Sequence, residues 1–123
     1  MILQTRGLKY QSDDSWVSLV VDYGILQTYL WLVKKEFPDK RFCEPLAKAH
    51  VTFVRGKTLT KEQINYIRKQ NPKDFVVDYL SDIQTDGFHW WLPAFSVSLD
   101  ALRGEIGLAK KRFPYHITFG VRC

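Results

Sequence analysis

The sequence repeats one tetrapeptide, as His50-Val51-Thr52-Phe53 and again, near its end, as His116-Ile117-Thr118-Phe119. Both copies are β-type sequence, in which side chains two residues apart share a face, so each copy presents an imidazole beside a hydroxyl. Two such strands placed side by side would form a cleft with two histidines. A pair of imidazoles can accept and donate protons near neutral pH in one turnover. The repeat therefore predicts an acid–base site built from two half-units.

A single histidine in a strand is more often a buried structural residue than a catalyst. Here the chain holds only three histidines, and two of them carry the same motif about half the chain length apart. Such internal similarity favours two equivalent half-units, so we interpret His50 and His116 as a functional pair. The third, His89, lies in a Phe-His-Trp-Trp run without the threonine, and we expect it to be structural or peripheral.

Length and composition limit the class of protein. With 123 residues, 46% hydrophobic and 15% aromatic, the chain suits one globular domain covering residues 1–123. The formal net charge of +5 favours an anionic ligand such as a nucleotide or RNA. We see no secretory leader and no uninterrupted apolar span, so we expect neither secretion nor membrane association.

The cysteines and histidines do not suggest a metal site or a disulfide framework. Cys43 and Cys123 have neither the spacing of metal ligands nor that of a disulfide framework. Two histidines without a carboxylate at fixed spacing make a poor set of metal ligands. We therefore expect no disulfide, no metal, no cofactor and a reducing, cytoplasmic location.

Periodicity and turn signals predict an alternation of strands and helices. Thr60 as N-cap, with Gln63 as its capping-box partner, marks one helix start, and Ser98 is the N-cap expected for a later helix. Pro93 is expected to interrupt a strand, and the N-terminus around Arg6–Tyr10 to be mobile. The expected strands cover residues 16–22, 49–55, 74–80, 88–92, 94–98 and the second motif. The expected helices cover 26–37, where 28–33 also fit a buried strand, 60–70 and 99–112.

Each half of this order ends in a His-x-Thr strand that follows a helix. The order predicts an α+β fold with a single bilobal domain. Two lobes related by a pseudo-twofold axis would line a central cleft with antiparallel sheets and carry their helices outside.

Two His-x-Thr motifs with apolar flanks, half a domain apart in a small α+β chain, resemble the signature of the two-histidine phosphoesterase superfamily, also called LigT-like. The resemblance spans about residues 16–120. It implies metal-independent cleavage of 2′,3′-cyclic phosphates, 2′–5′ linkages or cyclic oligonucleotides. It also implies that His50 and His116 are the acid–base pair and that Thr52 and Thr118 bind phosphate.

The small size and the Arg6–Tyr10 segment look similar to the compact viral anti-CBASS phosphodiesterases, which destroy the cyclic di- and trinucleotide signals of bacterial immunity. For such a viral protein the expected location is the host cytoplasm, and the expected partner is a cyclic oligonucleotide.

Three further residues are candidates for substrate binding. Tyr10 and one ring of the Trp90-Trp91 pair would stack on bases, and we give that role to Trp90, because alternation places one of the two rings in the core. Arg55 continues the first motif strand and would neutralise phosphate, with a solvated strand-end charge as the alternative.

Three functions therefore remain for the structure to weigh. The first is a metal-independent phosphodiesterase acting on cyclic oligonucleotides. The second is a 2′,3′-cyclic phosphodiesterase acting on RNA ends or nucleotides. The third is a non-catalytic, basic RNA-binding module with structural histidines.

Overall fold

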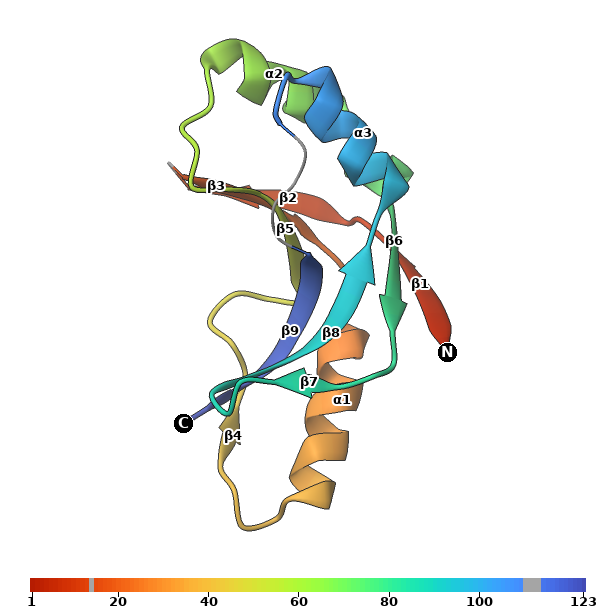
Figure 1. Cartoon of the computed structure of the whole chain (residues 1–123), viewed down its shortest axis with the longest axis vertical. Helices are drawn as coiled ribbons and strands as arrows, with labels where there is room; N and C mark the ends of the chain where they lie inside the picture. Colours follow the sequence, from red (N-terminus) through yellow and green to blue (C-terminus); the bar gives the residue numbers. More distant parts are fainter. Residues whose placement is uncertain (14, 110–113) are drawn as a thin grey trace.

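The computed structural model describes residues 1–13, 15–109 and 114–123, and these form an α+β fold with two antiparallel sheets (Figure 1). In one, sheet A, the strand order is β1-β6-β8-β9-β4, with β7 paired to β8. In the other, sheet B, it is β2-β3-β5. The strands are β1 Ile2–Arg6, β2 Lys9–Ser12, β3 Trp16–Val20, β4 Phe42–Cys43, β5 His50–Arg55, β6 Val76–Leu80, β7 Gln84–Thr85, β8 His89–Phe95 and β9 Tyr115–Arg122. The helices are α1 Tyr23–Glu36, α2 Lys61–Lys69 and α3 Val97–Glu105, with a 3₁₀ turn at Pro72–Asp74.

Two predicted helices are confirmed together with one of their start signals. The Thr60 side chain accepts a hydrogen bond from the Gln63 backbone N–H at 3.1 Å, and the Gln63 side chain accepts one from the Thr60 N–H at 2.9 Å. This is the predicted capping box. Residues 28–33, for which a buried strand was the alternative, are helical and belong to α1. This helix starts after Asp22, whose carboxylate accepts a hydrogen bond from the Gly24 N–H.

The predicted strand break at Pro93 is wrong, because β8 continues through it to Phe95. Proline lacks a backbone N–H. It is tolerated in a strand where its nitrogen faces no neighbouring strand that needs a hydrogen bond from it. β7 pairs with Trp90 and Trp91, while β6 pairs only from Ala94 onward. Pro93 therefore occupies the gap between these two neighbours.

The predicted start of the third helix is also wrong. Ser96, rather than Ser98, is the N-cap, and its hydroxyl accepts from the Leu99 N–H at 3.1 Å. The Ser98 hydroxyl instead accepts from the Val76 N–H at 3.1 Å, which ties the helix to β6. α3 ends at Glu105, and Gly107 then adopts a positive φ of 78°, which favours glycine. The last predicted helical residues, 110–112, lie outside the described residues.

The N-terminal segment is held in both sheets rather than mobile, so that expectation is wrong as well. β1 pairs with β6, and β2 pairs with β3. Gly7, between β1 and β2, donates its N–H to the Phe75 carbonyl at 3.1 Å. A β-carbon on Gly7 would lie 2.3 Å from the Pro72 carbonyl oxygen, so the chain passes here too closely for any side chain.

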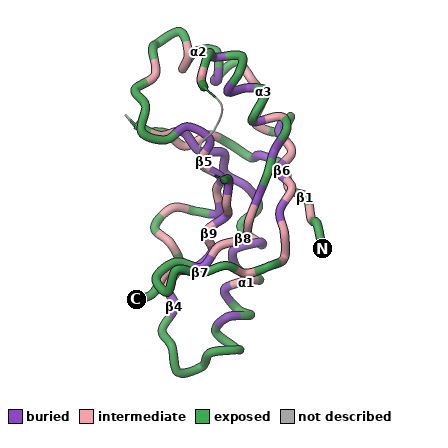
Figure 2. Tube along the Cα trace, in the orientation of Figure 1, coloured by how far each residue is buried: buried purple, intermediate pink, exposed green. Residues whose placement is uncertain are grey.

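The core is one continuous cluster that joins both sheets to the helices (Figure 2). α1 packs against β9, where Gly120 makes room for it: a β-carbon there would lie 3.3 Å from Leu30. α3 packs against β5 and β6. In Figure 1, α2 and α3 lie together at one end of the molecule and α1 lies towards the other.

The expectation that the cysteines form no disulfide is wrong. Cys43 and Cys123 are bonded, with their Cα atoms 5.5 Å apart, although 80 residues separate them. Spacing along the sequence could not reveal this, because the partners meet through the pairing of β4 with β9, in which Cys43 lies opposite Val121. The expectation of a reducing, cytoplasmic location loses its basis, since it rested on unpaired cysteines. None of the described helices is long and apolar enough to span a membrane.

The two motif strands belong to different sheets of unequal size. β5 is one of the two edge strands of sheet B, whereas β9 lies inside sheet A between β8 and β4. Sheet A also takes β1 and β4 from the N-terminal half of the chain. Strand pairing by itself therefore does not establish the two equivalent lobes that the repeat predicts.

Candidate two-histidine site

The two motif strands contact one another across the sheets, and their polar side chains line one open cavity of about 500 Å³. His50 and Thr52 come from β5, and His116 and Thr118 come from β9. The structure thus brings together the four residues that the repeated motif predicts. The rest of the lining is Arg55, Asp86, His89, Trp91 and Pro114.

Both motif strands carry a β-bulge at the same motif position. In β5, Thr52 lies opposite Ser18 and Val54 opposite Val17, so Phe53 has no partner. In β9, Thr118 lies opposite Trp91 and Gly120 opposite Trp90, so Phe119 has no partner. A bulge inserts one residue and reverses the alternation of faces beyond it. The similarity of the two half-sites therefore extends from the residue types to the backbone.

The bulge in β5 explains why Arg55 reaches the cavity. In a regular strand Arg55 would share a face with Phe53, away from His50 and Thr52. Beyond the bulge, Arg55 lies opposite Trp16 and on the same face as Thr52. The structure therefore places Arg55 at the predicted site.

Each histidine is held by a backbone group two residues earlier in the chain. His50 Nδ1 lies 2.5 Å from the Lys48 carbonyl oxygen, and His116 forms a hydrogen bond with the Pro114 backbone. A carbonyl oxygen only accepts, so Nδ1 of His50 donates in this contact, and Nε2 is the nitrogen left for proton transfer. The two imidazoles are thus oriented by equivalent contacts.

The environment of His116 favours its neutral form. Burial lowers the pKa of His116 below its ordinary value, and the positive charge of Arg55 lowers that pKa further. His50 and His89 also act in this direction, while the bond to Pro114 opposes it. The lowered pKa favours the neutral imidazole of His116, which is the form that can accept a proton.

The two threonines have different neighbours. The hydroxyls of Thr52 and Ser18 are 2.8 Å apart, and Ser18 is fully buried in sheet B. Ser18 thus fixes the orientation of the Thr52 hydroxyl, and no sequence signal pointed to this role. Thr118 lies opposite Trp91, whose ring centroid is 6.1 Å from that of His116.

The predicted tryptophan at the site is the wrong member of its pair. Trp90 is buried, and its ring packs edge-on against Phe42 with centroids 4.8 Å apart. Trp91 is half-buried and lines the cavity. Alternation correctly predicted one core and one outward ring, but the choice between them required the partner strand, because Trp91 lies on the face of Thr118 and His116.

His89 lies at the cavity although its sequence context lacks the motif. Its side chain is 54% exposed, and its Nδ1 is 3.3 Å from an Asp86 carboxylate oxygen. Hydrogen bonds from the backbone N–H groups of His89 and Phe88 hold the pKa of Asp86 at about 2. Asp86 is therefore a permanent anion that orients His89. The sequence feature that could have indicated this pairing is the position of Asp86, three residues before His89.

A second open cavity of about 490 Å³ adjoins the first. It shares His50, His89 and Thr118 with the first cavity and extends to Arg122 and the Cys43–Cys123 disulfide. This extension is mostly apolar, with Pro45, Leu46 and Val121 beside one acidic residue, Glu44, and one basic residue, Arg122. Together the two cavities offer room beside the two histidines for a ligand larger than one phosphate group.

Tyr10 does not reach this site. Its ring packs against Phe53 and Phe75, with centroids 6.4 Å away in each case, and its hydroxyl donates to the Gln70 carbonyl at 3.0 Å. Tyr10 lies opposite Leu19, on the face of sheet B turned away from Thr52 and Ser18. The structure thus separates Tyr10 from the histidines.

Within the described part of the chain, no group of three or more His, Cys, Asp or Glu side chains is arranged to hold a metal ion. Comparison of the chain with family models, curated proteins and solved structures finds no match. The assignment of a function therefore depends on the geometry of the site.

Proposed function

We propose that the protein is a phosphodiesterase of the two-histidine type that cleaves cyclic oligonucleotides by acid–base catalysis without a metal. The observation that carries the proposal is the convergence of two His-x-Thr pairs from different sheets on one cavity. The two strands have matching bulges, and the two histidines have matching backbone contacts. These similarities support a paired role, because two unrelated structural histidines would not be expected to share them.

The lowered pKa of His116 favours this residue as the general base. His116 would take the proton from a ribose 2′-OH, whose oxygen attacks the adjacent phosphorus. His50, in its protonated form, would donate a proton to the leaving 5′ oxygen as the P–O bond breaks. The products are a 2′,3′-cyclic phosphate and a 5′-OH, with one proton accepted and one released.

The polar groups around the pair would stabilise the charge that develops on the phosphate. Arg55 supplies a cation on the wall of the cavity, and Thr52 and Thr118 supply hydroxyl donors for the non-bridging oxygens. Ser18 would hold the Thr52 hydroxyl in place. Trp91 offers an aromatic surface beside His116 on which a base can stack.

The two adjoining cavities favour a substrate larger than a mononucleotide. A cyclic di- or trinucleotide could place one phosphate between His50 and His116 and a second part of the ring towards Arg122. The alternative activity on RNA ending in a 2′,3′-cyclic phosphate uses the same pair of histidines, so the choice of substrate decides between the two.

The test is a substrate panel incubated in excess EDTA, with products separated by chromatography. It contains cyclic di- and trinucleotides, an all-deoxy cyclic dinucleotide, 2′,3′-cyclic mononucleotides and an RNA with a 2′,3′-cyclic phosphate end. We expect the ribose cyclic oligonucleotides to be cut fastest and the all-deoxy analogue to resist. Preferred cleavage of the RNA end would instead support the alternative, and loss of all activity in EDTA would contradict the mechanism.

His89 offers a matched control for the removal of an imidazole from this cavity. His89→Ala should reduce kcat less than tenfold, because His89 has no threonine partner in the motif. If His89→Ala were as inactive as His50→Ala, the assignment of the catalytic pair would be wrong.

A further inference from the structure

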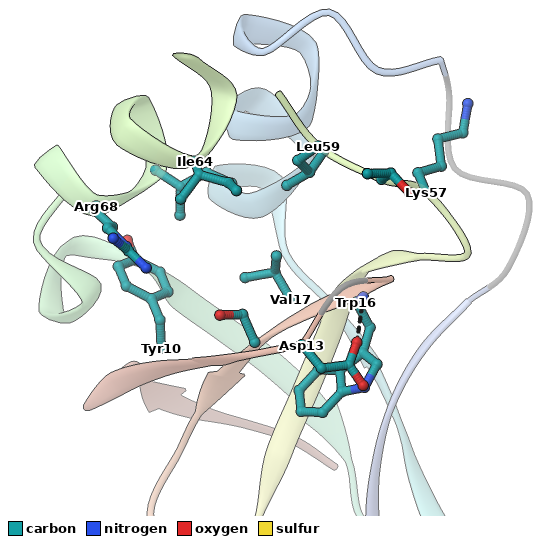
Figure 3. Close-up of a pocket in the computed structure, with 11 residues that line it drawn as sticks. Tyr10, Asp13, Trp16, Val17, Lys57, Leu59, Ile64 and Arg68 are labelled. Atoms are coloured by element: carbon teal, nitrogen blue, oxygen red, sulfur yellow. Dashed lines mark hydrogen bonds between the residues drawn. The ribbon is translucent and has the colours of Figure 1, made fainter. Parts of the chain in front are cut away.

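A separate cavity of about 440 Å³ lies between α2 and sheet B (Figure 3). It is on the face of the sheet opposite to the two-histidine cavity. Tyr10 and Ser12 of β2 lie on the same face as Leu19 and Val17 of β3, whereas Ser18 faces Thr52 on the other side. A volume of this size falls within the range of small-molecule sites.

The lining of this cavity combines apolar side chains with the aromatic ring of Tyr10. Val17 comes from β3, Ile64 and Ile67 from α2, and Leu59 from the segment before α2. Tyr10 supplies an aromatic ring. Trp16 also borders the cavity, but it lies opposite Arg55, so its side chain is on the other face of the sheet, with Ser18 and Thr52. Figure 3 shows Tyr10 next to Arg68 at one end of the cavity, Val17 pointing towards Leu59 and Ile64, and the Trp16 ring on the other side of the strand from Val17.

Hydrogen bonds hold the walls in place without a ligand. The Tyr10 hydroxyl donates to the Gln70 carbonyl just past α2 at 3.0 Å. The capping box at Thr60 anchors the start of α2, and the Gln63 side chain ties this helix to the Ile106 carbonyl at 2.8 Å. At the other end, the backbone N–H of Trp16 donates to the Asp13 carboxylate at 3.1 Å. The cavity is therefore preformed, which reduces the entropy lost on binding.

The charges at the two ends differ. Arg68 lines the end near Tyr10, and among the described residues its guanidinium takes part in no ion pair or hydrogen bond. Asp13 lies at the end near Trp16, where its carboxylate already accepts from the backbone N–H groups of Ser15 and Trp16. Lys57 also lines the cavity, but its ammonium points away from the centre in Figure 3. One end thus offers an unused cation.

We infer that this cavity binds a small organic anion with a planar apolar body. The apolar body would lie over Val17 beside the Tyr10 ring and beneath Leu59 and Ile64, and the negative group would meet Arg68 at the end away from Asp13. A guanidinium suits this task because its planar donors bind anionic oxygens in pairs. The site is independent of the two-histidine cavity, since sheet B separates them.

The probe for this site is 8-anilino-1-naphthalenesulfonate, a planar aromatic anion whose fluorescence rises in an apolar site. N-phenyl-1-naphthylamine has the same rings without the sulfonate. We expect the anion to bind at least fivefold more tightly than the neutral analogue. Arg68→Gln should abolish that preference, and Leu59→Trp, which fills the cavity, should weaken binding of both probes at least tenfold.

Three control variants test whether the probe binds outside the cavity between α2 and sheet B. Trp31→Ala removes an exposed aromatic ring of α1, Arg122→Gln removes an exposed arginine of β9, and His116→Ala alters the two-histidine cavity. Each should bind the anion as the original protein does, whether or not the protein proves to be a phosphodiesterase. Urea unfolding checks that the Leu59→Trp variant is folded. Arg68→Gln changes an exposed side chain, so we expect it to leave the fold intact.

The inference is overturned by any of three results: equal affinity for the two probes, unchanged anion binding in Arg68→Gln, or loss of binding in one of the controls. It is supported when both cavity variants weaken anion binding and all three controls retain it.

Discussion

Arg103 links the third helix to the backbone of the first motif, and replacing it tests whether this link holds the bulge. Its side chain is 7% exposed. One guanidinium nitrogen donates to the carbonyl of Phe53, the bulged residue, at 2.6 Å, and another donates to the Ala109 carbonyl at 2.8 Å. Arg103→Met keeps much of the apolar stem but removes both donors.

The expected loss of stability follows from these two contacts. A hydrogen bond from a charged donor contributes about 1.5–3 kcal/mol net, so two contribute about 3–6 kcal/mol. Part of this is offset because a buried guanidinium no longer has to be desolvated. We therefore expect Arg103→Met to lower the free energy of unfolding by about 3 kcal/mol. Arg103→Lys should lose about half as much, because one ammonium cannot serve both carbonyls in the same geometry.

The assay is urea unfolding followed by tryptophan fluorescence, with equal m-values required across variants. Arg122→Met is the matched control, since it removes an exposed arginine and should change stability by less than about 0.5 kcal/mol. A loss below about 0.5 kcal/mol for Arg103→Met would refute the reasoning. It would show that the bulge at Phe53 needs no partner from α3.

Three other predictions follow from the site and the disulfide. His50→Ala and His116→Ala should each lower kcat by about 10²–10⁴-fold with an unchanged unfolding midpoint, and activity within a few-fold of the original would contradict the paired mechanism. The pH–rate profile should fall on its acidic side as His116 becomes protonated, at a pH below the ordinary histidine pKa, because burial and Arg55 lower the pKa of His116. Arg55→Gln removes a like charge, so this limb should move to higher pH, and a limb that stays in place would exclude His116 as the base. Replacing Cys43 and Cys123 with serine should lower the free energy of unfolding by about 2–4 kcal/mol, since the bond closes a loop of 80 residues, and a urea midpoint equal to that of the original would refute this.

Local signals predicted the elements that depend on neighbours in the sequence. The capping box at Thr60 identified the start of α2, because both of its hydrogen bonds join residues three apart. The β-type composition of the two motifs correctly predicted strands β5 and β9. The strand at Pro93 and the helix start at Ser96 were predicted wrongly, because each depends on β6, a strand distant in sequence.

By itself, the sequence determined that two His-x-Thr pairs exist and that each pair occupies one face of a strand, since alternation is a property of the extended backbone. Tertiary structure alone decided which side chains join them. The bulge at Phe53 turned Arg55 towards the histidines, and the pairing of Thr118 with Trp91 placed that ring, rather than Trp90, at the cavity. The pairing of β4 with β9 joined Cys43 to Cys123, and the two faces of sheet B separated Tyr10 from the histidines. Each of these outcomes depends on strand register, which is set by contacts between segments far apart in the chain.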